Sequence, residues 1–92
     1  MKTMLVWRIP PGNYKPAIEG FLRAGAPVPS GVKTLGRWHT PGSTMGWLLL
    51  EANDLTGVAE HVAEWANLCE IVTYPVIDDA EAKIAASKAL GN

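Results

Sequence analysis

The stretch 32–52 constrains the fold of this chain more than any other part of the sequence. Two apolar runs, 32–40 and 45–52, flank Pro41-Gly42-Ser43-Thr44, a group of residues that favour turns. This pattern predicts a β-hairpin with a loop of about four residues. Residues 40 and 45 then pair, and the pairing continues through 38 with 47, 37 with 48 and 36 with 49 to 34 with 51.

Neighbouring side chains on a strand point to opposite faces, so the hairpin carries two different surfaces. This register places Trp38 opposite Trp47 on one face, followed by Gly36 opposite Leu49. The other face holds His39, Arg37, Leu35, Leu48 and Leu50. The consecutive residues Arg37, Trp38 and His39 are therefore predicted to belong to two features rather than to one cluster.

The rest of the chain alternates between strand and helix patterns. Residues 4–9 form a short apolar run closed by prolines, and residues 70–77 are rich in β-branched side chains, so both predict strands. Pro75 places the second of these at a sheet edge or at a bulge. Apolar residues recur with helical spacing in 13–25 and from Asp54 to about residue 68, and an alanine-rich helix is expected from Asp78 or Asp79 to Gly91.

This order, βαββαβ with a C-terminal helix, predicts an α+β fold of the ferredoxin-like type in a single domain over residues 1–92. Its four-stranded antiparallel sheet carries two helices on one face only. The other face would be polar if water covered it, yet the strands place large apolar side chains on both faces, such as Leu5 and Val6 or Trp47 and Leu48. We therefore expect the same face of another copy to cover it, as in a dimeric α+β barrel.

The composition supports a homodimer or higher homo-oligomer and disfavours other partners. Of the 92 residues, 48% are hydrophobic, 18% are charged and four are tryptophan, which is apolar-rich for so small a domain. The net charge is −1 and the eight Lys and Arg residues are scattered, so no binding to nucleic acid is predicted. No apolar run is long enough for a membrane span or a signal sequence, and the single Cys69 fits a reducing compartment, so we expect a cytoplasmic protein.

The hairpin carries the first candidate site residues. Arg37 and His39 either form a solvated rim or reach into a pocket between sheet and helices, where Arg37 would anchor an anion and His39 would act as donor or general acid/base. Glu51 lies among apolar residues, and partial burial would suit it to proton transfer, whereas a strand-end Glu more often pairs with a neighbouring Lys or Arg. Trp38 and Trp47 belong either to a dimer core or to the wall of an apolar cavity.

His61 and Trp65, one helical turn apart, form a second candidate pair. His61 is either a surface residue beside a half-buried Trp65, or the two residues flank a planar cofactor such as haem, with His61 as its axial ligand. No other histidine or cysteine lies at metal-ligand spacing, so no metal site and, haem aside, no cofactor is predicted. The sequence also contains no nucleophile elbow and no phosphate-binding glycine loop, so no strong catalytic motif supports an enzyme.

The segment that begins GAPVPSGVKTLGRWHTPGSTMGWLLLE resembles a family of small bacterial domains, the domain of unknown function 3303. The shared features are a G-x-P-x-P-x-G-V run at 25–32, a G-R-W-H-like strand, a strand ending in Glu51, a helix with a Trp near its end and a Pro-Val strand. The resemblance extends from Met4 to Asp78. It implies a fold similar to the dimeric α+β barrels, which include monooxygenases, haem-degrading enzymes and lactone isomerases, but no particular activity.

Three functions are open on these residues. The first is a homodimeric domain that binds a small hydrophobic or aromatic molecule, with the pocket shaped by Arg37, Trp38, His39, Trp47 and Glu51. The second is a cofactor-light oxygenase or isomerase for an aromatic or carbonyl substrate, with His39 or Glu51 as base and Arg37 holding an enolate oxygen. The third is a purely structural oligomerisation module.

Overall fold

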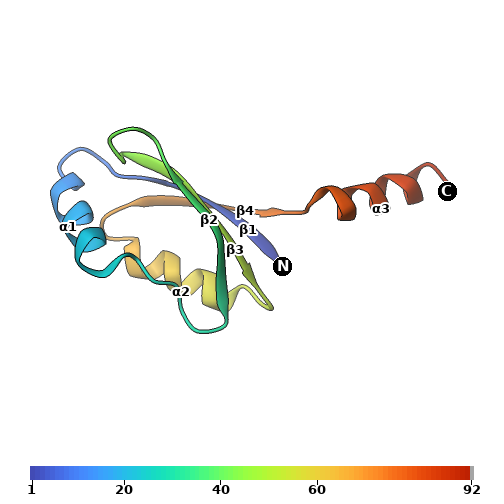
Figure 1. The fold of residues 1–92 in the computed structure, drawn as a ribbon, viewed down its shortest axis with the longest axis horizontal. Helices are drawn as coiled ribbons and strands as arrows, with labels where there is room; N and C mark the ends of the chain where they lie inside the picture. The colour runs from blue at the N-terminus through green and yellow to red at the C-terminus, as the bar shows by residue number, and fades with distance from the viewer. Residues whose placement is uncertain (92) are drawn as a thin grey trace.

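The computed structural model describes residues 1–91, which form four strands and three helices (Figure 1). The strands are β1 (Lys2–Arg8), β2 (Val32–His39), β3 (Met45–Ala52) and β4 (Glu70–Val76). The helices are α1 (Tyr14–Ala24), α2 (Thr56–Trp65) and α3 (Asp79–Ala89). The predicted order of strands and helices is confirmed, although α2 ends at Trp65 rather than near residue 68.

The four strands form one antiparallel sheet in the order β2-β3-β1-β4. This is the ferredoxin-like arrangement predicted from the order of the elements, with the first and third strands in the centre. Pro75 lies in the edge strand β4, where its missing N–H is tolerated. α1 and α2 lie on one face of the sheet, and within residues 1–91 no helix covers the opposite face (Figure 1).

The hairpin of β2 and β3 has the predicted register near its loop and a different one at its far end. Residues 36–39 pair as expected, whereas Thr34 pairs with Leu50, one residue earlier on β3 than predicted. Leu35 is the extra residue of a β-bulge at this point, and the bulge reverses the alternation of faces. Val32 consequently turns to the helix side, where its methyl group would lie 2.5 Å from a Cβ at Gly57.

The buried core lies between the sheet and α2. It consists of Leu5, Leu48, Leu50, Ala52 and Val58, and Leu5 and Leu50 are almost completely enclosed. A fully buried leucine contributes roughly 1.5–3 kcal/mol of hydrophobic free energy. This small cluster fills only part of the layer between the sheet and the helices, and a pocket occupies another part of it.

The face of the sheet that points away from the helices is called the outer face here. It carries the apolar side chains of Met4, Val6, Trp38, Trp47, Leu49, Val72 and Tyr74. Trp38 is 52% exposed and Tyr74 is 51% exposed. The prediction that this second face is apolar is therefore confirmed.

Two details concern the outer face and the elements around it. The ring of Trp38 lies over Gly36, where a Cβ would come within 2.3 Å of the ring, so the glycine makes room for the indole. α3 begins at a capping box formed by Asp78 and Glu81 and projects away from the sheet (Figure 1).

Among residues 1–91 no helix has the length and the apolar character that a membrane crossing requires.

Candidate functional site

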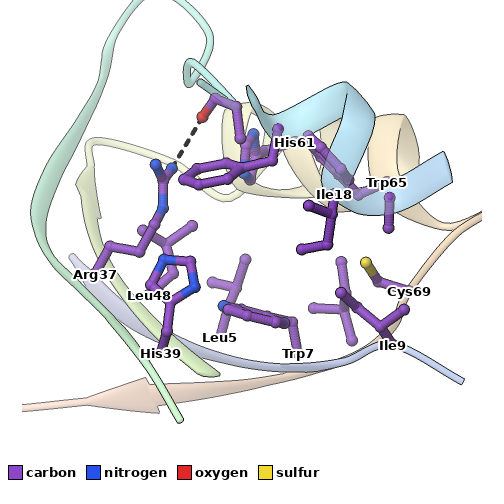
Figure 2. A pocket seen from close by; sticks show the side chains of 14 residues that line it. Leu5, Trp7, Ile9, Ile18, Arg37, His39, Leu48, His61, Trp65 and Cys69 are labelled. Atoms are coloured by element: carbon purple, nitrogen blue, oxygen red, sulfur yellow. Dashed lines mark hydrogen bonds between the residues drawn. The ribbon is translucent and has the colours of Figure 1, made fainter. Parts of the chain in front are cut away.

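A pocket opens between the sheet and the helices α1 and α2 (Figure 2). The cavity itself measures about 70 Å³, and it widens into open space at its mouth. The lining residues are Leu5, Trp7, Ile9, Ala17, Ile18, Phe21, Ala26, Arg37, His39, Leu48, His61, Trp65, Cys69 and Ile71.

One wall of the pocket is aromatic and is built over a glycine. Gly46 of β3 lies beneath the ring of Trp7, and a Cβ at this position would come within 2.2 Å of that ring. The imidazole of His39 meets Trp7 edge-on, with centroids 5.2 Å apart, and lies 5.4 Å from the ring of Phe21. His39 is thus an exposed side chain whose ring is held between two aromatic neighbours.

Arg37 extends from β2 to the C-terminal end of α1. Its Nη1 donates to the carbonyl oxygen of Gly25 at 3.2 Å. Its Nη2 donates to the carbonyl oxygen of Ala26 at 2.9 Å, the dashed line in Figure 2. The guanidinium carbon also lies 5.9 Å from the centre of the Phe21 ring, a cation–π contact. Burial lowers the pKa of Arg37, but a guanidinium keeps its charge at physiological pH. Its other N–H groups have no hydrogen-bond partner within residues 1–91.

His61 of α2 is the buried polar side chain of the pocket. Only 4% of its surface is exposed, and its Nδ1 has no hydrogen-bond partner among the described residues. Burial lowers the pKa of His61 below its usual 6.5, the charge of Arg37 lowers it further, and Glu64 opposes this effect. The imidazole is therefore neutral at pH 7 and carries one ring nitrogen whose hydrogen bond is unmade.

Trp65 and Cys69 line the pocket near the end of α2. The ring of Trp65 lies 3.8 Å from the place that a Cβ at Gly20 would take, which is an ordinary van der Waals distance. Burial raises the pKa of the Cys69 thiol. The thiol therefore stays protonated at neutral pH, which makes it a weak nucleophile and a wall of the pocket rather than a reactive group.

The structure divides the residues singled out in the sequence into two groups. Arg37, His39, His61 and Trp65 come together around the pocket. Trp38, Trp47 and Glu51 lie on the outer face, away from it. The carboxylate of Glu51 is 3.5 Å from Nζ of Lys2, so it forms the ion pair that was the alternative to a role in proton transfer. The interpretation of His61 as a surface residue is wrong, because α2 turns it into the pocket.

Sequence reasoning did not identify Trp7, Phe21 and Cys69 as site residues. All three belong to apolar segments whose pattern indicates core packing, and Trp7 and Phe21 are two aromatic rings that could equally have filled the interior. The signal that could have found the aromatic wall is Gly46, a glycine near the start of the central strand β3. Such a glycine often marks a place where another group approaches the backbone closely.

Comparison with known proteins identifies a family and a fold. The family model described as Domain of unknown function (DUF3303) matches residues 1–90. No curated protein matches the chain. A solved structure, "Structure of Rv0793 from Mycobacterium tuberculosis", is similar with a TM-score of 0.51 and 13% identity, over 86% of this chain and 97% of that one. At this identity the likeness supports the fold alone. Among residues 1–91 no group of three or more His, Cys, Asp or Glu side chains is placed to hold a metal ion.

Proposed function

The chain belongs to the family described as Domain of unknown function (DUF3303), and we propose that it binds a small, flat, largely apolar molecule in its pocket and works as a homodimer. The observation that carries the binding proposal is the imidazole of His61, which lines the pocket and has an unpartnered nitrogen. Nearly all buried polar groups in proteins are hydrogen-bonded, so an exception beside a cavity supports a partner that binds there.

The lining determines which molecules fit. Most of the wall consists of aliphatic and aromatic side chains, which favour a flat apolar body. Polar groups lie at two places: the neutral imidazole of His61 offers one hydrogen bond, and the N–H groups of Arg37 beyond the two bonded to Gly25 and Ala26 would offer further donors to an oxygen. A ring system with one hydroxyl or carbonyl group therefore matches the pocket better than a hydrocarbon or a sugar does.

Titration with 2-naphthol and with naphthalene tests this proposal. Both have the same two-ring body, and only 2-naphthol carries a hydrogen-bonding group. We expect amide shifts of pocket residues in NMR spectra with both probes and about fivefold tighter binding of 2-naphthol, since one hydrogen bond contributes about 1 kcal/mol. The variant His61→Leu should lose most of this preference for 2-naphthol. The absence of shifts with either probe at saturating concentration contradicts the binding proposal.

The homodimer is supported by the outer face. Trp38, Val72 and Tyr74 are each more than half exposed on it, and an apolar sheet face of this kind is stable in water only when covered. The same face of a second copy can cover it, because in a dimer with a two-fold axis each copy buries the outer face of the other. The two-sided distribution of apolar residues thus supports a pocket on one side of the sheet and a subunit contact on the other.

Sedimentation equilibrium tests the homodimer. We expect a dimer at micromolar concentration and a weaker dimer for Trp38→Glu. Leu22→Glu is the matched control, because Leu22 is an even more exposed apolar side chain (77%) but belongs to α1, on the helix side of the sheet. A wild-type protein that stays monomeric at high micromolar concentration, or equal effects of the two substitutions, contradicts a dimer through the outer face.

A second candidate function, proton transfer on the bound molecule, is favoured by the lowered pKa of His61. A neutral imidazole can accept a proton from a carbon next to a carbonyl group, and the charged Arg37 can stabilise the enolate oxygen that results. Deuterium exchange into 1-tetralone, a two-ring ketone, measures this step in D₂O by NMR. A rate that is the same for wild type, His61→Leu and buffer contradicts the catalytic candidate and leaves the binding proposal unaffected.

A further inference from the structure

α3 is a helix without a packing partner in its own chain. None of its residues is buried, and Ile84 is 59% exposed. The helix projects beyond the end of β4 and away from the rest of the domain (Figure 1). It lengthens the molecule to 53 Å, and the radius of gyration is 15.5 Å, whereas a compact chain of this length has about 12 Å. The extended shape therefore comes from a single well-formed element.

The start of α3 is nevertheless firmly attached. Asp78 accepts a hydrogen bond from the backbone N–H of Glu81, and the side chain of Glu81 accepts one from the backbone N–H of Asp78. Nζ of Lys2 lies 3.5 Å from the Asp78 carboxylate and 3.6 Å from that of Glu81, which ties this end to β1. An isolated helix of 11 residues is marginal in water even when it is rich in alanine, so the rest of α3 needs a surface to pack on.

Apolar side chains at helical spacing mark the side of α3 suited to such a contact. Ala80 and Ile84 are four residues apart in α3 and form a short apolar ridge on the arm. Ile84 is 59% exposed. Ile77, which is 60% exposed, lies just before the helix and is separated from it by the extended cap residue Asp78.

The area that a stable dimer requires favours a second copy as the partner of this ridge. A standard interface buries about 800 Å² of accessible surface on each partner. One side of an 11-residue helix, about 16 Å long and 10 Å wide, covers roughly 160 Å² of flat area. In a symmetric dimer each copy gives one arm and receives one, so arm exchange adds two such contacts to the surface that each partner buries, whereas an unlike partner would cover one arm only.

We propose that α3 is an exchanged arm, which packs through Ile84 on the partner copy while the partner's arm packs on this one. The inference rests on the homodimer proposed above and is independent of the ligand. The order of the elements supports it, because α3 follows the edge strand β4 and leaves the sheet at its end, so the arm lies outside its own domain.

Two full-length variants test the arm by sedimentation equilibrium. Ile84→Glu introduces a charge on the ridge, and Ala86→Glu introduces the same charge two residues later, on the opposite side of the helix. Neither side chain is buried in the free chain, so both variants should fold. We expect Ile84→Glu to weaken the dimer at least about tenfold and Ala86→Glu to weaken it less than about threefold. Equal dimer strength for wild type and Ile84→Glu contradicts the proposal.

A mixed-label experiment locates the arm directly. One batch carries Cys69→Ser and Ala89→Cys with a spin label on α3, and a second, unlabelled wild-type batch is enriched in ¹⁵N. In a mixed dimer we expect broadening of ¹⁵N signals from residues 1–77, which only the arm of the other copy can cause. A dimer without this broadening overturns the arm and leaves the homodimer in place. A monomeric mixture at high micromolar concentration overturns both, because the homodimer is the premise of the arm.

Discussion

Replacing His61 by leucine is expected to stabilise the free protein. His61 is 4% exposed and its Nδ1 has no hydrogen-bond partner among the described residues, so folding transfers a polar nitrogen out of water without compensation. Such a group costs about 1–3 kcal/mol, and leucine has a similar volume and no polar atom. Leucine is also favoured over histidine inside a helix by a few tenths of a kcal/mol. Together these effects predict a gain of about 2 kcal/mol in the free energy of unfolding.

Urea denaturation and thermal melting measure this gain. In a domain of this size 1 kcal/mol moves the melting temperature by about 4–8 °C, so His61→Leu should melt roughly 10 °C higher than the wild type. The matched control is His61→Gln, because glutamine is as good a helix former as leucine but keeps a polar group at the same place. We expect no comparable gain for this control.

The same variant should remove a pH dependence of stability. The pKa of His61 is lowered in the folded state, mainly by burial, from the usual 6.5 that applies to the unfolded chain. The unfolded chain therefore binds more protons than the folded one as the pH falls below about 6.5, and the wild type loses stability from there down to the folded-state pKa. The free energy of unfolding of His61→Leu should not show this loss as the pH falls below about 6.5.

Two results would refute this reasoning. If His61→Leu unfolds at a lower urea concentration than the wild type, Nδ1 has a partner that stabilises the fold. If His61→Gln gains as much as His61→Leu, the polarity of the imidazole is not the source of the effect.

Three further substitutions test separate parts of the structure. Gly46→Ala should lower the free energy of unfolding by about 2 kcal/mol in urea titration, because its Cβ would meet the ring of Trp7 at 2.2 Å in the packed wall. Arg37→Leu should cost about 1–2 kcal/mol and speed amide exchange in residues 25–29, because two carbonyl groups after α1 lose their donors. Asp78→Ala should reduce the helical ¹³Cα shifts of α3, because the capping box is lost. The hydrogen bond from the Glu81 N–H lowers the pKa of the Asp78 carboxyl below 3.8, so the wild type should keep its helical shifts at pH 5 and lose them only on acidification below 3.8.

The sequence predicted those parts of the fold that depend on local patterns. Alternation in residues 45–52 and the turn residues after Thr40 are sufficient for the hairpin, and the pairing of Trp38 with Trp47 follows from the loop length alone. Pro75 predicted either an edge position or a bulge for β4, and the structure shows the edge position. The same alternation assigned Arg37 and His39 to the helix side, where both now line the pocket.

Features that depend on tertiary packing could not be predicted in this way. The apolar pattern around Leu35 is compatible with a strand with or without a bulge, and in the observed register Val32 lies beside Gly57, a contact between distant parts of the sequence. His61 is buried on α2, and its burial depends on how α2 packs on the sheet, which the helical spacing of residues 54–68 does not determine.

The unpartnered nitrogen and the uncovered surfaces make the stability of this domain depend on other molecules. A chain of 92 residues buries only about two thirds of its surface on folding, so a defect of 1–3 kcal/mol at His61 is a large part of its net stability. A ligand at about 100 times its dissociation constant adds about 2.7 kcal/mol, which is of the same size. His61→Leu should therefore stabilise the free form while reducing the increment that a hydrogen-bonding ligand adds. Dimer formation acts through the same linkage, and the melting temperature of the wild type should rise with protein concentration as well as with 2-naphthol.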